Sequence, residues 1–446
     1  MNTVFYEGLM KKVLRNFFIA GVLMVMGAGC FAQKTLNAAD SEPAKMGWMQ
    51  GFPPAKDKII SAADGSFFVF PALRYSVNHI REFYPTREVK AAKEKTYKFK
   101  TKIDKNIDNV TFIPWGEKDS ITWKESLDKN FMDGIIILHK GKIVYEDYAG
   151  GLTPDGVHAA MSVSKSFTGI LASILIAEGV IDPNALVTDY ISEMKGSGYE
   201  GATVAQVLDM TTAIDYSEDY NDINAGVWKY SAAGSIFRAP DYNGPENYYE
   251  YLPTLKKIEG QEHGEKFGYK TVNTELMGWI ISRATGKCIT ELISEKIWVP
   301  MGACVDGYYQ LDPAGKAFAG GGFDLNLRDM ALFGELLRNG GKLNGKQIIP
   351  LQAVKDVSGG GSQKAFAAGG EYPLLNGWSY HNMWWITNNE HGAYMARGVH
   401  GQAIYIDPKA EMVIARFASN PLASNKYIDP LSIPAYEAVA DYLMKK

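Results

Sequence analysis

Hydrophobic positions change their spacing along the chain, and these changes mark the expected strands and helices. The run Gly134–His139 is apolar throughout, and Lys142–Tyr148 follows it after the short turn Lys140-Gly141. Two β-rich runs around a glycine-containing turn predict a hairpin. A first strand without polar positions indicates that both of its faces are covered.

The other expected elements divide the chain into an outer sheet and an inner helical part. Helices are expected at 205–210, at 274–284 with Gly286 as the stop, and after Asn326 as N-cap. Strands and a closing helix are expected in the last third, at 383–387, 401–408, 412–417 and 435–444. Strands at both ends with helices between them predict an α/β fold. Its single sheet is built from N- and C-terminal parts, and a mostly helical region is inserted between them.

The N-terminus has the pattern of an export signal over residues 1–32. A basic segment, Met10–Asn16, precedes the apolar run Phe17–Met26, which is too short to span a bilayer comfortably. Cys30 follows a Gly-Ala-Gly run that resembles a bacterial lipobox, although glycine stands where leucine is typical. The alternative is cleavage after Ala32. We therefore expect an exported protein, either a periplasmic one or a membrane-anchored lipoprotein, and the sequence leaves the two open.

Polar residues follow the signal, and 33–60 is expected to be a linker or tether. Residues 61–446 are interpreted as one domain, which begins with an ordered arm at Phe70–Thr86. The lysine-rich stretch 88–108 is expected to be a solvated surface segment.

Composition limits the kinds of function. The chain has 446 residues, 46% hydrophobic and 22% charged, which is enough for a large core. Its net charge of −4 gives no bulk attraction to nucleic acid or to an anionic membrane. Apart from Cys30 there are only Cys288 and Cys304, which either pair in an oxidising compartment or remain free. No Cys/His spacing suggests a metal site, and we expect neither a metal nor another cofactor.

The first candidate for chemistry is Ser162-Val163-Ser164-Lys165, at the start of an apolar run. Residues three apart share a face of a helix, so Ser162 and Lys165 would lie side by side. A desolvated lysine can accept the serine proton as a neutral amine, which activates the hydroxyl. The N–H groups of the first helical turn could stabilise the negative charge that then develops. Because Ser-x-x-Lys is common by chance, other segments must support it.

A second segment, Gly264–Trp279, carries Tyr269 on a loop just ahead of a helix. A phenol near a lysine cation loses its proton more easily. Tyr269 is therefore a candidate proton shuttle between Ser162 and a leaving group. The alternative is a core tyrosine, which is the ordinary expectation for any one of 25 tyrosines.

A third segment, Arg397–Ile404, contains His400-Gly401-Gln402. A glycine at the start of an edge strand lets a substrate lie against the backbone. The N–H of Gln402 would then be a second oxyanion donor, opposite that of Ser162. His400 is either a substrate contact or an ordinary strand residue. The remaining histidines are expected to be structural or superficial: His79, His139, His158, His263, His381 and His391.

In their order along the chain, the three segments resemble the three motifs of serine β-lactamase-like hydrolases. That group includes class C β-lactamases, D-alanyl-D-alanine carboxypeptidases, esterases and 6-aminohexanoate-dimer hydrolases. The resemblance is greatest to the last subgroup and extends from about residue 70 to the end, through the arm, the hairpin, Gly264–Trp279 and Gly398–Gln402. It implies a β-lactamase/transpeptidase-like fold, with an antiparallel sheet flanked by helices.

The same resemblance implies a role for each motif residue. Ser162 would be the acylated nucleophile, Lys165 the lysine that assists it, and Tyr269 the general base and acid. The N–H groups of Ser162 and Gln402 would form the oxyanion hole.

Two departures from the β-lactamase pattern bear on the substrate. Tyr-x-Asn is stretched here, because asparagine arrives only at Asn273, four positions after Tyr269. Lys-Thr-Gly is absent, and Val399-His400-Gly401 stands in its place. Since that lysine helps to hold a substrate carboxylate, its loss favours a neutral ester or amide over β-lactams and D-Ala-D-Ala peptides.

Sequence alone leaves a leading function and two alternatives. The leading one is an exported serine hydrolase that cleaves a small amide or ester through a Ser162 acyl-enzyme. Tyr220 or Tyr216, together with Trp384, are expected in the wall of its pocket. The alternatives are a penicillin-recognising peptidase or β-lactamase, and a non-catalytic binding protein on the same fold. The natural substrate and the oligomeric state are left open.

Overall fold

The computed structural model describes residues 36–220, 222, 224–238 and 241–446. The expected signal over 1–32, with Cys30, lies outside the described residues. Within them, no helix is long and apolar enough to cross a membrane.

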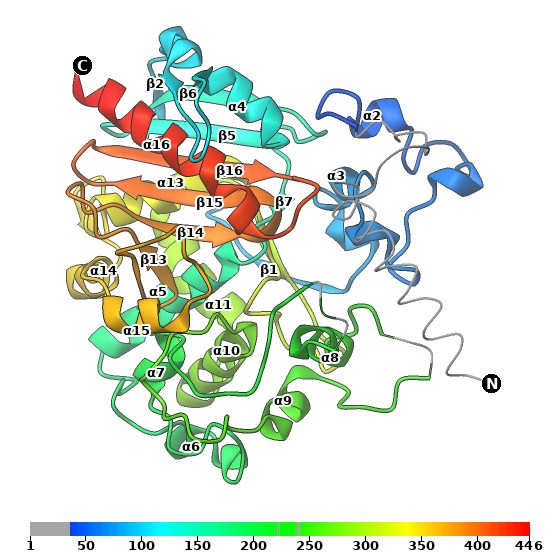
Figure 1. Cartoon of the computed structure of the whole chain (residues 1–446), viewed down its shortest axis with the longest axis vertical. Helices are drawn as coiled ribbons and strands as arrows, with labels where there is room; N and C mark the ends of the chain where they lie inside the picture. Colours follow the sequence, from blue (N-terminus) through cyan, green and yellow to red (C-terminus); the bar gives the residue numbers. More distant parts are fainter. Residues whose placement is uncertain (1–35, 221, 223, 239–240) are drawn as a thin grey trace.

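An eight-stranded sheet forms the centre of the molecule and joins its two ends (Figure 1). Its spatial order is β12-β13-β14-β15-β16-β5-β6-β2, and all neighbours are antiparallel except β2 and β6. The strands are β2 (Lys100–Thr101), β5 (Met132–His139), β6 (Lys142–Tyr148), β12 (Ser379–His381), β13 (Trp384–Ile386), β14 (Tyr394–Gly398), β15 (Gln402–Asp407) and β16 (Met412–Ala418). The expected hairpin of β5 and β6 is confirmed, and β15 and β16 form a second one. Strand β16 pairs with β5 and so closes the sheet from N- and C-terminal parts.

Helices cover both faces of this sheet. Helix α13 (Leu327–Arg338) packs so closely on one face that a methyl group at Gly334 would lie 2.6 Å from the side chain of Val413. Helix α16 (Asp429–Met444) covers the other face, where the rings of Tyr405 and Tyr436 are 5.3 Å apart. The layers match the expected α/β fold with an antiparallel sheet flanked by helices.

A helical region lies beside the sheet and occupies the lower part of Figure 1. It contains α6 (Val187–Tyr190), α7 (Val204–Leu208), α8 (Gly226–Ala233), α9 (Tyr248–Tyr251), α10 (Thr271–Thr285), α11 (Ile289–Ile293) and α12 (Val299–Met301). Helix α10 ends at Gly286, whose φ of 70° provides the left-handed cap that glycine adopts without strain. Before α13, the side chain of Asn326 accepts a hydrogen bond from the Arg328 N–H, which confirms the expected N-cap.

Smaller elements complete the described fold. The helices are α2 (Pro43–Met46), α3 (Leu73–Ser76), α4 (Trp123–Lys129), α5 (Val163–Ala177), α14 (Leu351–Ser358) and α15 (Gln363–Gly369). A four-stranded sheet has the order β1-β8-β9-β7, from Thr86–Val89, Gly307–Gln310, Phe323–Leu325 and His158–Ala159. Two-stranded ribbons pair β3 (Thr111–Phe112) with β4 (Ile121–Thr122), and β10 (Lys342–Leu343) with β11 (Lys346–Gln347). Cys288 and Cys304 are free thiols.

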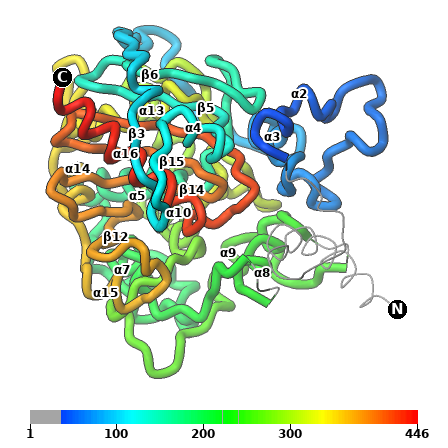
Figure 2. Tube along the Cα trace, turned by 45° about the horizontal axis from the view of Figure 1, so that its top comes forward, coloured from blue at the N-terminus to red at the C-terminus, as the bar shows by residue number. Residues whose placement is uncertain are grey.

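In the structure the N-terminal arm is longer than expected and comprises residues 36–85, which lie at one side of the body in both views (Figures 1 and 2). It is fastened by Arg74, whose Nη2 lies 2.9 Å from Glu42 Oε1 and 3.2 Å from Asp133 Oδ1 in strand β5. The guanidinium of Arg74 and the carboxylate of Asp133 are fully buried. The described part of 33–60 is therefore not a free tether, because Glu42 and its neighbours are held in this ion-pair cluster.

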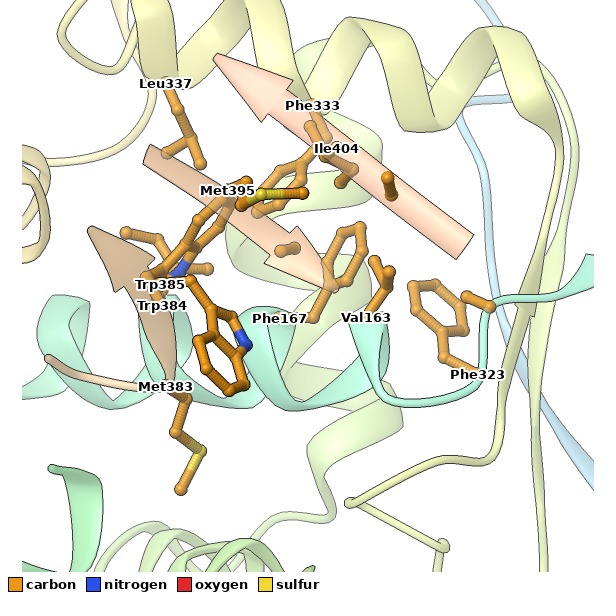
Figure 3. Packing of buried hydrophobic residues seen from close by; sticks show 14 of the residues in the cluster. Val163, Phe167, Phe323, Phe333, Leu337, Met383, Trp384, Trp385, Met395 and Ile404 are labelled. Atoms are coloured by element: carbon orange, nitrogen blue, oxygen red, sulfur yellow. The ribbon is translucent and has the colours of Figure 1, made fainter. Parts of the chain in front are cut away.

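A cluster of aromatic rings fills the space between the sheet and helix α5 (Figure 3). The ring of Phe167 in α5 stacks on Phe333 of α13 at 4.0 Å and meets Phe323 edge-on at 4.9 Å. Such ring pairs add to the free energy gained by burying their area. This packing fixes α5 against the sheet and so fixes the position of its N-terminus.

Candidate active site

Helix α5 begins directly after Ser162, which stands at its N-cap position. The turn before it is tight, because Met161 has a φ of 49°, a value that side-chain-bearing residues seldom adopt. The side chain of Ser162 makes no capping bond, so its hydroxyl is available for chemistry. The predicted spacing is confirmed: Lys165 Nζ lies 3.0 Å from Ser162 Oγ.

Lys165 is buried, with 1% of its surface exposed. Its ammonium also donates a hydrogen bond of 2.6 Å to the carbonyl oxygen of Gly320. Burial lowers the pKa of Lys165 to about 8, although the Glu218 and Glu275 carboxylates oppose this shift. About a tenth of the lysine is then a neutral amine at pH 7. The site thus holds a base beside the hydroxyl that it would deprotonate.

The first turn of α5 offers fewer free N–H groups than expected. Those of Val163, Ser164 and Lys165 donate to the carbonyls of Ala160, Met161 and Ser162, respectively. These three groups are therefore engaged, which corrects the expectation that the whole turn could stabilise an oxyanion. The backbone N–H of Ser162 itself remains the candidate donor on this side.

Tyr269 lies on the other side of the nucleophile, at the end of the loop before α10. Its hydroxyl shares a hydrogen bond with Ser162, and Lys165 Nζ lies 5.1 Å from its ring centroid. The structure thus brings Ser162, Lys165 and Tyr269 together. The expected loss of the phenolic proton is not supported, however, because burial, with the Glu218 carboxylate, raises the pKa of Tyr269. A neutral phenol suits a proton donor better than a resting base.

Two carboxylates that the sequence analysis did not single out hold the Tyr269 loop. Glu371 Oε2 accepts a hydrogen bond of 3.1 Å from the Tyr269 N–H. Glu218 accepts one from the N–H of Thr271, the first residue of α10. Lys270 lies between them, and both carboxylates act to keep its charge while burial lowers its pKa. The phenol is thereby fixed from both sides by groups on distant loops.

Aromatic rings form a wall behind Tyr269. Trp385 stacks on Tyr269 with ring centroids 5.4 Å apart, and Tyr372 packs edge-on against Trp385 at 4.8 Å. The guanidinium of Arg397 lies 4.2 Å from the Trp385 ring and is paired with Asp429. These contacts orient the ring that carries the candidate proton donor.

The strand β14 borders the nucleophile through Gly398. A methyl group added at Gly398 would lie 2.7 Å from the carbonyl oxygen of Ala160, two residues before Ser162. Strand β14 pairs with β13 only at Tyr394 and Met395, whereas it pairs with β15 along its whole length. Its last residues therefore leave a backbone edge beside the site, against which an extended substrate can lie.

The glycine of the third segment that borders the nucleophile is Gly398 and not, as expected, Gly401. A methyl group at Gly401 would instead meet the side chains of Ala418 and Arg416 at 3.0 and 3.5 Å, so this glycine packs on β16. Gln402 uses its side chain to hold the Ala418 backbone, with bonds of 2.6 and 3.0 Å. The proposed role of the Gln402 N–H as an oxyanion donor stays a prediction.

His400 is a structural residue in this arrangement. Its Nδ1 lies 2.7 Å from the carbonyl oxygen of Asn420, and its ring meets Phe68 of the arm edge-on at 5.1 Å. Only 1% of its surface is exposed, and burial lowers its pKa to about 4. The neutral ring is therefore packed against the arm, which favours the interpretation of His400 as a structural residue; its contact with substrate stays a prediction.

Two other expected site residues also belong to the framework. Asn273 accepts hydrogen bonds from the hydroxyls of Tyr199 and Thr212 in two loops, at 2.9 and 3.0 Å. It also donates one of 3.3 Å to the Val207 carbonyl of α7, so it ties α10 to its neighbours. Trp384 is fully buried and donates to the Ser166 carbonyl (Figure 3). Because side chains alternate along a strand, its neighbour Trp385 faces Tyr269 instead.

Tyr220 remains near the site. Its ring packs on Trp228 at 6.0 Å, and the Glu218 carboxylate and Tyr269 both act with burial to raise its pKa. Tyr216 lies deeper, and its ring meets Tyr230 edge-on at 6.4 Å. Tyr220 is thus the better of the two candidates for a pocket wall.

Known proteins that are similar to this chain are serine hydrolases of the kind that this geometry indicates. Residues 127–429 match the Beta-lactamase family. The chain is 36% identical over 298 residues to 6-aminohexanoate-dimer hydrolase of Paenarthrobacter ureafaciens, which covers 67% of this chain and 75% of that protein. A Bacillus anthracis structure assigned as a 6-aminohexanoate-dimer hydrolase is similar with a TM-score of 0.78 and 32% identity, over 88% of this chain and 99% of the other. The hydrolase EstCE1 shares the fold alone, with a TM-score of 0.55 and 14% identity, over 71% and 96%.

The fold, the Ser162–Lys165–Tyr269 constellation and these similarities define a class of protein. The chain belongs to the β-lactamase family of serine hydrolases. Within that family it is an amidase/esterase-type hydrolase, and its relatives by sequence and by structure include 6-aminohexanoate-dimer hydrolases.

Proposed function

We propose that the protein is an exported hydrolase that cleaves a small, neutral amide or ester through an acyl-enzyme on Ser162. The single observation that carries the proposal is the contact of 3.0 Å between Ser162 Oγ and Lys165 Nζ, a buried amine with a pKa of about 8. A lysine in that state can accept a proton near neutral pH, which an exposed lysine cannot do.

Acylation begins when the neutral amine of Lys165 takes the proton of the Ser162 hydroxyl. The oxygen attacks the substrate carbonyl carbon, and the Ser162 N–H stabilises the oxyanion that forms. As the intermediate collapses, the neutral phenol of Tyr269 protonates the departing amine or alcohol and recovers a proton from Lys165. An ester on Ser162 remains, and the first product leaves.

Deacylation repeats these steps with water in place of the hydroxyl. Lys165, or Tyr269 acting for it, removes a proton from the water that attacks the acyl carbon. The bond to Ser162 Oγ breaks, the serine regains its proton, and the acid is released. No step requires a metal or an organic cofactor.

The surroundings of Ser162 support a neutral substrate. The only cation on strand β14, Arg397, is paired with Asp429 and covered by Trp385, so it does not replace the lysine of Lys-Thr-Gly. The backbone edge at Gly398 and the aromatic wall suit an extended chain with amide or ester groups. The name of the Paenarthrobacter relative favours a linear amide among such substrates.

A hydrolysis panel of p-nitrophenyl esters, linear amides, D-amino peptides and β-lactams tests the proposal. We expect turnover of esters or linear amides, and mass spectrometry of the quenched enzyme should show the acyl group on the Ser162 peptide. Ser162→Ala should lose about 10⁴- to 10⁶-fold in kcat. Equal turnover by wild type and Ser162→Ala would support a non-catalytic binding protein. Rapid and stable labelling by a fluorescent penicillin would indicate a penicillin-recognising enzyme instead.

Export is the part of the proposal that rests on the N-terminal sequence pattern. Mass spectrometry of the mature N-terminal peptide separates its two forms. A diacylglyceryl group on Cys30 would identify a lipoprotein, and an unmodified N-terminus after Ala32 a periplasmic protein. A mature chain that still begins at Met1 or Met10 would contradict export.

A further inference from the structure

Glu275 is a buried carboxylate close to the site, and the mechanism above does not use it. It lies on helix α10, and 1% of its surface is exposed. All its described hydrogen-bond partners are donors: Tyr230 O–H at 2.8 Å and Gly320 N–H at 2.7 Å on Oε1, and Ala319 N–H at 3.2 Å on Oε2. Such a set stabilises the ionised carboxylate and holds two successive peptide groups.

The peptide that Glu275 holds is the one that orients Lys165. The Gly320 N–H donates a hydrogen bond to Glu275. The carbonyl oxygen of Gly320 accepts a hydrogen bond of 2.6 Å from Lys165 Nζ. A methyl group at Gly320 would lie 2.4 Å from Thr271 Cγ2 and 3.0 Å from Glu275 Oε1, so the segment has no space to shift toward α10. A chain of direct contacts therefore runs from Glu275 through Gly320 and Lys165 to Ser162.

We propose that Glu275 is a positioning residue: it holds Ala319 and Gly320 so that the Gly320 carbonyl places the Lys165 amine beside Ser162 Oγ. This inference rests on the proposed function, in which Lys165 is the base. Glu275 does not touch the substrate or the reacting atoms. It acts on the geometry of the base and, as a nearby negative charge, on its protonation.

The charge of Glu275 also acts on the pKa of Lys165, and the direction of this effect is known. The Glu275 carboxylate raises the pKa of Lys165 against the larger effect of burial, and burial raises the pKa of Glu275 itself to about 7. Removing the charge of Glu275 should therefore lower the pKa of Lys165 further. The other titratable groups around the pair are Glu218 and Tyr269 on the substrate side and Tyr230, Tyr248, Tyr249 and Tyr309 behind it.

The test compares Glu275→Gln with a matched control, Asp329→Asn. Asp329 is also a carboxylate with 1% exposure, and it accepts two successive backbone N–H groups, from Cys304 and Val305, at 2.8 and 2.9 Å. Both substitutions place an amide N–H₂ where an acceptor is needed, so both disturb a buried loop contact. Only Glu275 is connected to the base.

For Glu275→Gln we expect kcat to fall about ten- to a hundredfold with a smaller change in KM, because the base is displaced from the hydroxyl. The rising limb of kcat/KM against pH should also move to lower pH. Asp329→Asn should keep the wild-type limb and most of kcat. Glu275→Asp retains the charge but shortens the reach, so it should lower kcat while its limb stays closer to the wild-type position.

The outcomes separate this inference from the proposed function. A Glu275→Gln enzyme with the wild-type pH limb, and a kcat loss no greater than that of Asp329→Asn, would overturn the positioning role. An active Ser162→Ala enzyme would overturn the function itself, whatever Glu275 does. If Glu275→Gln does not fold, Glu275→Asp decides, because a wild-type kcat in that variant contradicts the requirement for geometry.

Discussion

The two flanks of Ser162 are built from different kinds of contact. On the flank of helices α5 and α10, hydrogen bonds run from Ser162 through Lys165 and Gly320 to Glu275, at distances of 2.6 to 3.0 Å. On the flank of strand β14, the close approach is between Gly398 and the Ala160 backbone, with no ionisable side chain between them. The difference assigns proton transfer to the first flank, and contact with an extended substrate along the backbone edge of β14 to the second.

The largest effect on this comparison should come from Lys165→Met. Loss of the amine that takes the Ser162 proton should lower kcat about 10³- to 10⁴-fold, while KM remains similar. Wild-type kcat/KM should rise as the pH passes through about 8, because the neutral amine is the active form of a lysine whose pKa burial lowers to that value. A pH series on both enzymes measures this limb. If kcat/KM of Lys165→Met rises at the same pH as that of the wild type, a group other than Lys165 is titrating.

Tyr269→Phe should have the next largest effect. The leaving group loses its proton donor but the ring wall remains, so kcat should fall about 10²- to 10³-fold. Esters of p-nitrophenol, whose leaving group needs no proton, should be affected much less than amides with an alkylamine leaving group. Comparing the two substrate classes with wild type and variant measures the difference. An equal loss on both classes would indicate that Tyr269 acts in attack rather than in departure.

Gly398→Ala tests the strand flank. Its methyl group would clash with the Ala160 carbonyl at 2.7 Å, so the strand or the nucleophile segment must move. Such a displacement should lower kcat/KM about tenfold to a hundredfold and leave the pH limb unchanged. Gly401→Ala is a comparison that adds backbone strain, because Gly401 has a φ of 102° and its methyl group would meet Ala418 and Arg416 on β16. A shifted limb in Gly398→Ala would mean that the two flanks are not independent.

The smallest effect on activity should come from His400→Asn, since His400 contacts no reacting group and asparagine tolerates its φ of 63°. Stability should change instead. Burial lowers the pKa of His400 to about 4, so the unfolded chain takes up a proton first as the pH falls below about 6.5. The wild type should therefore lose about 1–3 kcal/mol between pH 6.5 and 4 that the variant retains. Denaturant unfolding at several pH values measures this, and parallel curves for both proteins would contradict it.

The sequence was sufficient to predict contacts between residues that lie close together along the chain. Ser162 and Lys165 belong to one helical turn, so their spacing predicts their contact, and the hairpins follow from patterns of a few residues. Trp384 and Trp385 show the limit. A run of apolar residues in a strand does not tell which face meets the core: Trp384, expected at the site, is fully buried, and its neighbour Trp385 stacks on Tyr269.

Contacts between distant segments that carry no motif could not be predicted. Gly320 is 155 residues from Lys165, and no motif marks its carbonyl as a partner of the amine. Gly398 and Gly401 lie three positions apart, and only the packing of the folded chain shows which one approaches the nucleophile segment. Glu275 gave one weak signal, a carboxylate within the apolar face of an expected helix, which indicates a buried polar role.

The buried pair of Arg74 and Asp133 has a practical consequence for anyone who shortens this enzyme. Asp133 lies in strand β5, and a version trimmed past the arm would remove its Arg74 partner, leaving the buried carboxylate with His158 Nε2 at 3.2 Å as its remaining partner. Breaking a buried ion pair by removing one side commonly costs about 3–5 kcal/mol. Expression designs intended for crystals or industrial use should therefore start upstream of Glu42. The arm behaves as a structural part of the catalytic body, and a protease that removes it should inactivate the enzyme.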